Sequence, residues 1–246
     1  MAGHSKWANI KHRKRANDAK KGKLFGRLVK EITMAAKQGG ALPEGNPRLR
    51  IALQSAKSAN LPKENITRAI QKGSSKDAAA YKEITYEGYA AHGVAVIVAC
   101  MTDNINRTVA AVRSIFTKHG GNMGKSGSLA FLFARKGIFT VSKEEVADEE
   151  AWTLDLIEAG AENIEEKMNC YHITCALETF GHIQHKLERR NTTIVEASLQ
   201  YVHNTSVVLE DDTATQVMKL IEDLEGHDDV QTVFHNMVVH NGHPAP

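Results

Sequence analysis

The first fifteen residues hold the densest group of side chains that could bind a polyanion. Five of them are Lys or Arg, and Trp7 is their only large aromatic residue. Flexible cations neutralise phosphates and release the counterions around a nucleic acid, and an indole ring can stack on an unpaired base. Because the segment has little to bury, we expect residues 1–16 to be flexible until a partner binds. The candidate contacts are Lys6, Trp7, Lys11, His12, Arg13, Lys14 and Arg15; the alternative is a solubilising tail.

Positive charge continues into a predicted helix. From about Asp18 onward, Leu24, Leu28 and Ile32 recur every four residues, which is typical of a helix with one apolar face. Cations recur beside that stripe at spacings of three and four, so they share a face. The candidate contacts on this helix are Lys20, Lys21, Lys23, Arg27 and Lys30.

Charge is segregated along the chain. Residues 1–77 contain 18 Lys or Arg and 5 Asp or Glu, a balance of +13, whereas the rest contains 13 and 24, a balance of −11. Solvated surfaces normally mix both signs, so this division indicates that one end meets a polyanion. Two alternatives stay open: lysines merely clustered on soluble helices, and acidic domains that dock a basic protein partner.

A second candidate group begins another predicted helix. Asn104, Asn106 and Arg107 follow Thr102-Asp103, and polar groups at a helix N-terminus suit contact with a phosphate. Helix capping and an internal ion pair between Arg107 and Asp103 explain the same residues equally well.

The sequence offers little to support catalysis. The loop Gly120–Ser128 has Gly124-Lys125-Ser126 but His119 where a phosphate-binding loop needs glycine, and it leads from a predicted helix to a strand. Its amides could still hold a backbone phosphate. His182 and His185 lack further residues at ligand spacing. We therefore expect no enzyme, cofactor or metal site, with an enzyme of unrecognised chemistry as the alternative.

Cysteine use and hydropathy indicate a cytoplasmic protein. The three cysteines, Cys100, Cys170 and Cys175, lack a C-x2-C spacing, which argues for reduced thiols. No apolar run approaches the roughly 20 residues that cross a bilayer. The basic start lacks the apolar stretch of a secretory signal. We expect a monomer without a membrane partner.

Periodicity predicts an α+β chain of three domains. Residues 1–77 are expected to form three helices: Gly39-Gly40 ends the first, Asn46-Pro47 starts the second, and Gly73–Lys76 is a linker after the third. Residues 137–206 have the order β-α-β-β-α-β of a ferredoxin-like sandwich. The flanks, 78–136 and 207–240, each have an apolar face that neither can bury alone. We therefore predict that they join as a second ferredoxin-like domain, into which the third is inserted. The predicted strands in these flanks are 84–89, 94–101, 129–133, 207–209 and 230–238.

The sequence resembles the YebC family of bacterial regulators and its mitochondrial translational-activator relatives. The resemblance covers essentially the whole chain. It is carried by Ala2–Lys11 and on to Arg15, by Tyr86-Glu87-Gly88-Tyr89, and by the motif residues between Thr102 and Ser128. Two loops depart from the family pattern, at Ala90–Gly93 and at Tyr201–His203.

The resemblance implies three domains and no known catalysis. Family members are assigned as DNA-binding transcriptional regulators, and others resemble ribosome-associated translation factors that help difficult peptide sequences through synthesis. We therefore expect a DNA-binding transcriptional regulator, with a translation factor that contacts ribosomal RNA as the alternative. Phosphate neutralisation is the same for DNA and RNA, so charge does not separate the two.

Overall fold

The computed structural model describes residues 3–75 and 81–240, and side chains from residue 18 on except that of Ala19. Contacts within the chain divide it into two units, Met1–Lys82 and Glu83–Pro246. Among the described residues, no helix combines the length and apolar character needed to cross a membrane.

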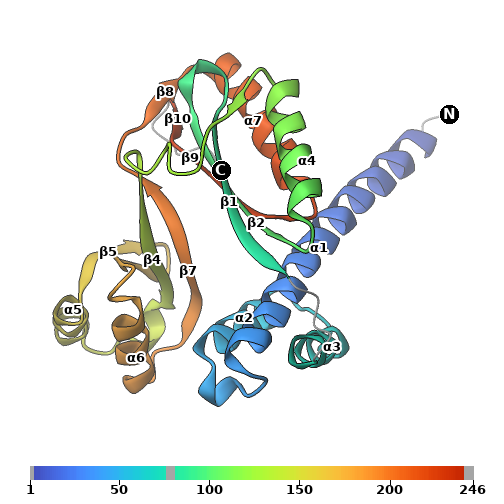
Figure 1. Ribbon diagram of the computed structural model, residues 1–246. Coiled ribbons are helices and arrows are strands. Elements are labelled where there is room, and N and C mark those ends of the chain that lie inside the picture. The colour runs from blue at the N-terminus through green and yellow to red at the C-terminus, as the bar shows by residue number, and fades with distance from the viewer. Residues whose placement is uncertain (1–2, 76–80, 241–246) are drawn as a thin grey trace. The chain divides into compact units, whose positions relative to one another are not determined.

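The first unit contains the three predicted helices, α1 (Gly3–Gly39), α2 (Pro47–Ser58) and α3 (Lys63–Ser74), with a 3-10 turn at Pro43–Gly45. The C-terminal half of α1 packs against α2 and α3, and its N-terminal half extends beyond them (Figure 1). The core is made of small and branched apolar side chains: Ile32, Ala35, Leu49, Ala52, Ala56, Leu61 and Ala69.

Helix α1 begins at Gly3, whereas the sequence pattern predicted a start near Asp18 after an arm without regular structure. The reason is intrinsic propensity. Residues 4–21 contain no proline or glycine and are rich in Ala, Lys and Arg, which are strong helix formers. Once the packed half of α1 supplies the nucleus, adding each further residue forms a hydrogen bond at little cost.

Asn46 confirms the predicted start of α2 and also connects that helix to α1. Its side-chain oxygen accepts a hydrogen bond from the Leu49 N–H at 3.0 Å, which caps α2. Its amide group donates to the carbonyls of Ala35 and Gly40, both at 2.8 Å. A buried side chain therefore satisfies polar groups at the end of one helix and the start of the next.

Gly73 lies inside α3, although the sequence predicted that it ends the helix and opens a linker. A Cβ atom at this position would lie 2.4 Å from the Thr33 carbonyl oxygen of α1. The glycine therefore permits the close crossing of α1 and α3, where Thr33 Oγ1 also donates to the Ala69 carbonyl at 3.3 Å.

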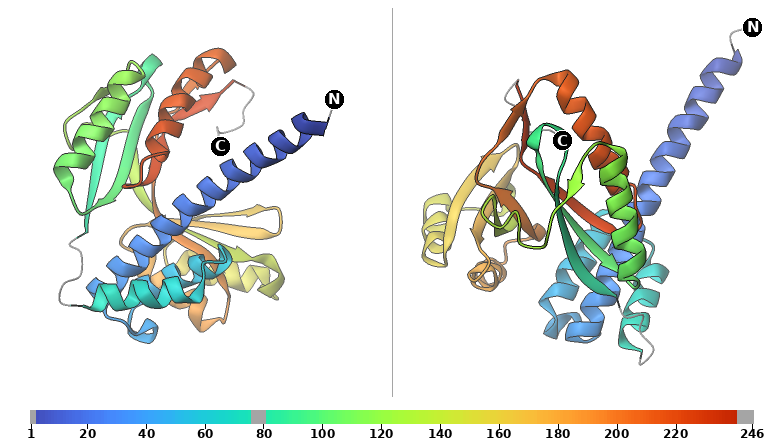
Figure 2. Two further views of the ribbon diagram at one scale, coloured as in Figure 1. Left: turned by 90° about the vertical axis from the view of Figure 1, so that its right-hand side faces the viewer. Right: turned by 45° about the horizontal axis from the view of Figure 1, so that its top comes forward.

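The second unit begins with a host domain formed from both ends of its sequence. Strands β1 (Lys82–Tyr89), β2 (Ala95–Thr102), β3 (Asn122–Met123) and β9 (Val230–His235) form one sheet in the order β3-β1-β2-β9. Helices α4 (Ile105–Lys118) and α7 (Asp211–Glu225) cover one face of it (Figures 1 and 2). Short strands β8 (Val207–Leu209) and β10 (Met237–Val239) pair in parallel beside it.

Strand β2 is apolar from Ala95 to Met101, and both of its faces are covered. Val96 and Val98 face the core formed with α4 and α7. Ala95 and Ile97 point the other way, into a cluster with Leu129 and with Tyr201 of the inserted domain. This continuous burial fits the unbroken apolar run in the sequence.

The inserted domain has the predicted order of elements. These are β4 (Phe133–Ser142), α5 (Glu149–Glu158), β5 (Ala161–Lys167), β6 (Cys170–Ala176), α6 (Phe180–Arg189) and β7 (Ile194–His203). The sheet order is β5-β6-β4-β7, and every pair is antiparallel. This ferredoxin-like arrangement, with β9 returning to pair with β2, confirms the predicted insertion of one α/β domain in another.

Two predicted strands differ in the structure. Residues 129–132 form turns, and β4 starts only at Phe133. Leu129 is fully buried in the cluster that faces β2, so apolar character here reflects burial of a turn. The predicted strand 230–238 is broken at Asn236, whose side-chain oxygen accepts the Ala95 N–H at 2.9 Å and whose amide donates to Thr205 at 3.0 Å. Pairing then passes from β2 to β8.

Candidate nucleic-acid interface

The described part of the basic helix presents three of its five candidate cations to solvent. Lys20, Lys21 and Lys23 are exposed, whereas Arg27 and Lys30 are half-buried near the core of the first unit. The Lys21 ammonium lies 5.4 Å from the centre of the Phe25 ring. The helix therefore offers a row of positive charge that continues toward its N-terminus.

The seven candidates nearest the N-terminus have side chains outside the described residues. Their backbone belongs to α1, so they follow a helical repeat and do not form an extended arm. They are Lys6, Trp7, Lys11, His12, Arg13, Lys14 and Arg15. Their contact with nucleic acid stays a prediction.

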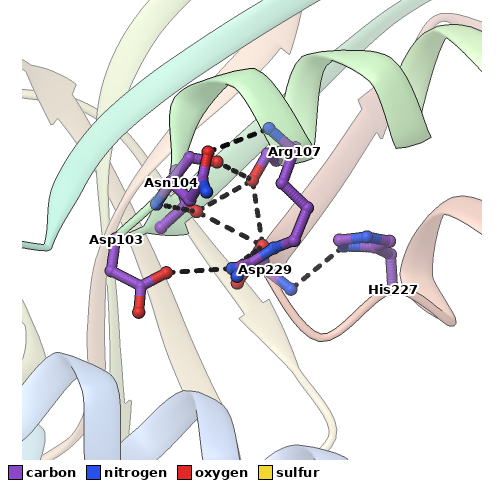
Figure 3. A network of polar contacts seen from close by, with 7 residues as sticks. Asp103, Asn104, Arg107, His227 and Asp229 are labelled. Atoms are coloured by element: carbon purple, nitrogen blue, oxygen red, sulfur yellow. Dashed lines mark hydrogen bonds and ion pairs between the residues drawn. The ribbon is translucent and has the colours of Figure 1, made fainter.

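The second candidate group forms part of a polar network at the start of α4 (Figure 3). The Asn104 side-chain oxygen accepts the Arg107 N–H at 3.0 Å and so caps the helix. The Arg107 guanidinium donates to Asp103 at 2.9 Å and to Asp229 at 3.0 Å. Asn106 is exposed on the first turn.

Asp229 is the centre of this network and was not a candidate from the sequence. It is 5% exposed, and its carboxylate also accepts from the hydroxyls of Thr108 at 2.9 Å and Thr102 at 3.3 Å. Hydrogen bonds to Asp229 and then to Asp103 raise the pKa of Arg107. The carboxylate lies about 120 positions further along the chain, so no local spacing could have revealed this partner.

The network favours the structural interpretation of Asn104 and Arg107. Asn104 caps α4, and Arg107 joins the helix start to the turn before β9 through Asp229. About half of the Arg107 side chain is still exposed. Asn106 is the member of the group whose exposed side chain suits an outside ligand. The basic helix and this group belong to different units of the chain.

The glycine-rich loop is organised by an internal carboxylate. Glu87 of β1 accepts hydrogen bonds from the N–H groups of Gly127 at 2.8 Å and Leu129 at 2.7 Å. The Ser128 hydroxyl also donates to it at 3.4 Å. The expectation that amides of this loop could hold a backbone phosphate therefore fails for the Gly127 amide, because the Glu87 carboxylate already accepts its hydrogen bond.

Comparison with known proteins agrees with this architecture. The family model described as "TACO1/YebC protein N-terminal domain" matches residues 5–76, and "TACO1/YebC second and third domain" matches residues 81–237. The chain belongs to the TACO1/YebC family. The first match covers the basic helical unit, and the second covers the host and inserted domains together.

Relatives in this family carry the names of regulators. A protein of Amoebophilus asiaticus named "Probable transcriptional regulatory protein" is 59% identical over 239 residues, covering 96% of this chain and 98% of its own length. One of Dictyoglomus turgidum with the same name is 48% identical over 237 residues, covering 96% and 95%. A crystal structure of a conserved hypothetical protein from Aquifex aeolicus is 43% identical, with a TM-score of 0.77 and coverage of 90% and 92%. Both of these named relatives are described as regulatory proteins, and neither carries the name of an enzyme.

Proposed function

We propose that this TACO1/YebC-family protein is a transcriptional regulator that binds DNA chiefly through helix α1. The observation that carries the proposal is the continuous basic helix: lysines exposed at positions 20, 21 and 23 continue a run of cations toward the N-terminus. A helix with cations along its length can follow a phosphate backbone. The net charge of +13 in residues 1–77 would add long-range attraction.

Salt dependence provides the test. Binding of the full chain to a labelled DNA duplex is measured by fluorescence anisotropy over a range of salt concentrations. A variant that lacks residues 1–16 should bind more weakly, and its plot of log K against log salt should flatten by about 0.9 per lost phosphate contact. Deletion of residues 241–246, which contain no Lys, Arg, Asp or Glu, is the matched control. If the slope of log K against log salt is unchanged after deletion of residues 1–16, this basic segment serves solubility and does not bind nucleic acid.

A ribosome-associated translation factor is the second candidate, and Trp7 is the residue that favours it. An indole ring can stack on the unpaired bases that are common in RNA loops. Crosslinking in cells followed by sequencing of the bound nucleic acid separates the two. Enrichment of promoter DNA supports the transcriptional proposal, whereas enrichment of ribosomal RNA near the peptidyl-transfer region replaces it with the translational one.

A further inference from the structure

Two lysines from different helices of the first unit meet at one aromatic ring. The ammonium of Lys30 in α1 lies 5.8 Å from the centre of the Tyr81 ring. The ammonium of Lys72 in α3 lies 5.4 Å from the same centre. Among the described residues, no carboxylate lies within ion-pair distance of Lys72.

The crossing of α1 and α3 causes this convergence. Lys72 directly precedes Gly73, the residue that brings α3 against the Thr33 carbonyl of α1. Lys30 lies one turn before Thr33 on α1. The close crossing therefore brings the backbone positions of Lys30 and Lys72 near each other, although the two positive charges repel. The electron-rich faces of the Tyr81 ring offset part of that repulsion.

We propose that Lys30 and Lys72 together bind one backbone phosphate of the nucleic acid, and that Tyr81 is a positioning residue that holds the two ammonium groups ready. This inference rests on the proposed function and extends its binding surface from α1 to α3. Lysine side chains are flexible, so both ammonium groups can move from the ring to the oxygens of one phosphate while the helices stay in place. A phosphate between them also removes their mutual repulsion.

The charge test compares glutamine variants of the full chain on a labelled DNA duplex. Lys72→Gln should weaken binding about three- to fivefold near 0.1 M salt, and Lys30→Gln/Lys72→Gln about five- to tenfold. Because both ammonium groups bind one phosphate, the double variant should lower the slope of log K against log salt by about 0.9. Two separate phosphate contacts would lower it by roughly 1.8. Lys57→Gln, an equal charge change at an exposed lysine of α2, is the control and should weaken binding less than Lys72→Gln does.

The ring test changes no charge. Tyr81→Leu should weaken binding about two- to fivefold, whereas Tyr81→Phe, which keeps the aromatic face, should bind like the wild type. Thermal melting of each variant checks that the fold is intact. A purely structural role for Tyr81 would lower the melting temperature of Tyr81→Leu and leave the affinity of its folded fraction unchanged.

The outcomes separate this inference from the proposed function. If the wild-type protein does not bind DNA or RNA at low salt, both fall. If it binds and Lys72→Gln behaves like Lys57→Gln, only the site at Tyr81 is overturned. A slope change near 1.8 in the double variant would also overturn it, because the two lysines would then contact separate phosphates.

Discussion

Replacing Gly73 with alanine should change the free energy of unfolding in two opposite ways, through helix propensity and through packing. Replacing glycine with alanine inside a helix ordinarily stabilises it by about 0.8–1.0 kcal/mol, because the backbone loses less freedom on folding. At position 73 the added methyl group would lie 2.4 Å from the Thr33 carbonyl oxygen and 2.9 Å from the Ala36 Cβ atom. Both contacts are far shorter than a normal van der Waals separation.

The packing cost should exceed the helix gain. The Thr33 oxygen belongs to the backbone of a packed helix. Removing its clash with the new methyl group therefore requires α3 to move away from α1 by about 1 Å. A gap of that size forfeits a quarter to a half of the dispersion energy of the contacts it opens, and overpacking of this kind costs about 1–3 kcal/mol. Because the clashing atom belongs to the backbone and cannot rotate away, we expect a packing cost of about 3 kcal/mol and a net loss of about 2 kcal/mol for Gly73→Ala.

Gly26→Ala is the matched control on α1, since nothing lies within 4 Å of the methyl group it would add. It should gain the helix contribution alone, about 0.8–1.0 kcal/mol. Urea denaturation followed by circular dichroism measures both variants, and their difference isolates the packing cost. If Gly73→Ala proves as stable as Gly26→Ala, the close crossing of α1 and α3 is wrong.

Four further substitutions test other contacts. Asn46→Ala should lose about 2–3 kcal/mol of unfolding free energy, because it removes the α2 cap and two buried donors at once; a loss under about 0.5 kcal/mol in urea denaturation would contradict this. Asp229→Ala should lose a similar amount, about 2–3 kcal/mol, by taking an acceptor from three side chains, whereas Asp103→Ala, which removes the exposed partner of Arg107, should stay within about 1 kcal/mol of wild type. Hydrogen bonds from Lys118 and then His119 lower the pKa of Asp223 from 3.8 to about 2, so its contribution to stability is present above about pH 4 and is lost as the pH falls toward 2. The unfolding midpoint of Asp223→Asn should therefore depend less on pH than that of the wild type across this window; parallel curves would refute the coupling.

The patterns that depend on near neighbours predicted most elements. A four-residue apolar period located α1 from Asp18 onward, and Asn46-Pro47 located the start of α2. The order β-α-β-β-α-β between Ile138 and Leu199 predicted the inserted domain, because alternation and helical period change clearly there. The start of α1 was missed, since its first turns have no apolar face and are helical through propensity alone.

The candidate site was predictable only in part, for the same physical reason. Charge is a property of residue type, so the sequence alone identified the basic surface of α1 and its lysines. Which polar groups are already occupied depends on distant parts of the chain. Asp229 holds Arg107 and Glu87 holds the loop amides, and neither contact has a sequence signal.

The sequence by itself therefore determined most of the helices and strands, the segregation of charge and the family, because these follow from composition and local spacing. Tertiary structure decided the rest. It turned Gly73 from an expected helix end into a helix crossing, and it brought Lys30 and Lys72 to one ring. It also engaged Arg107 within the fold. These outcomes depend on packing and on the desolvation of polar groups, which act between residues that are neighbours in space and distant in sequence.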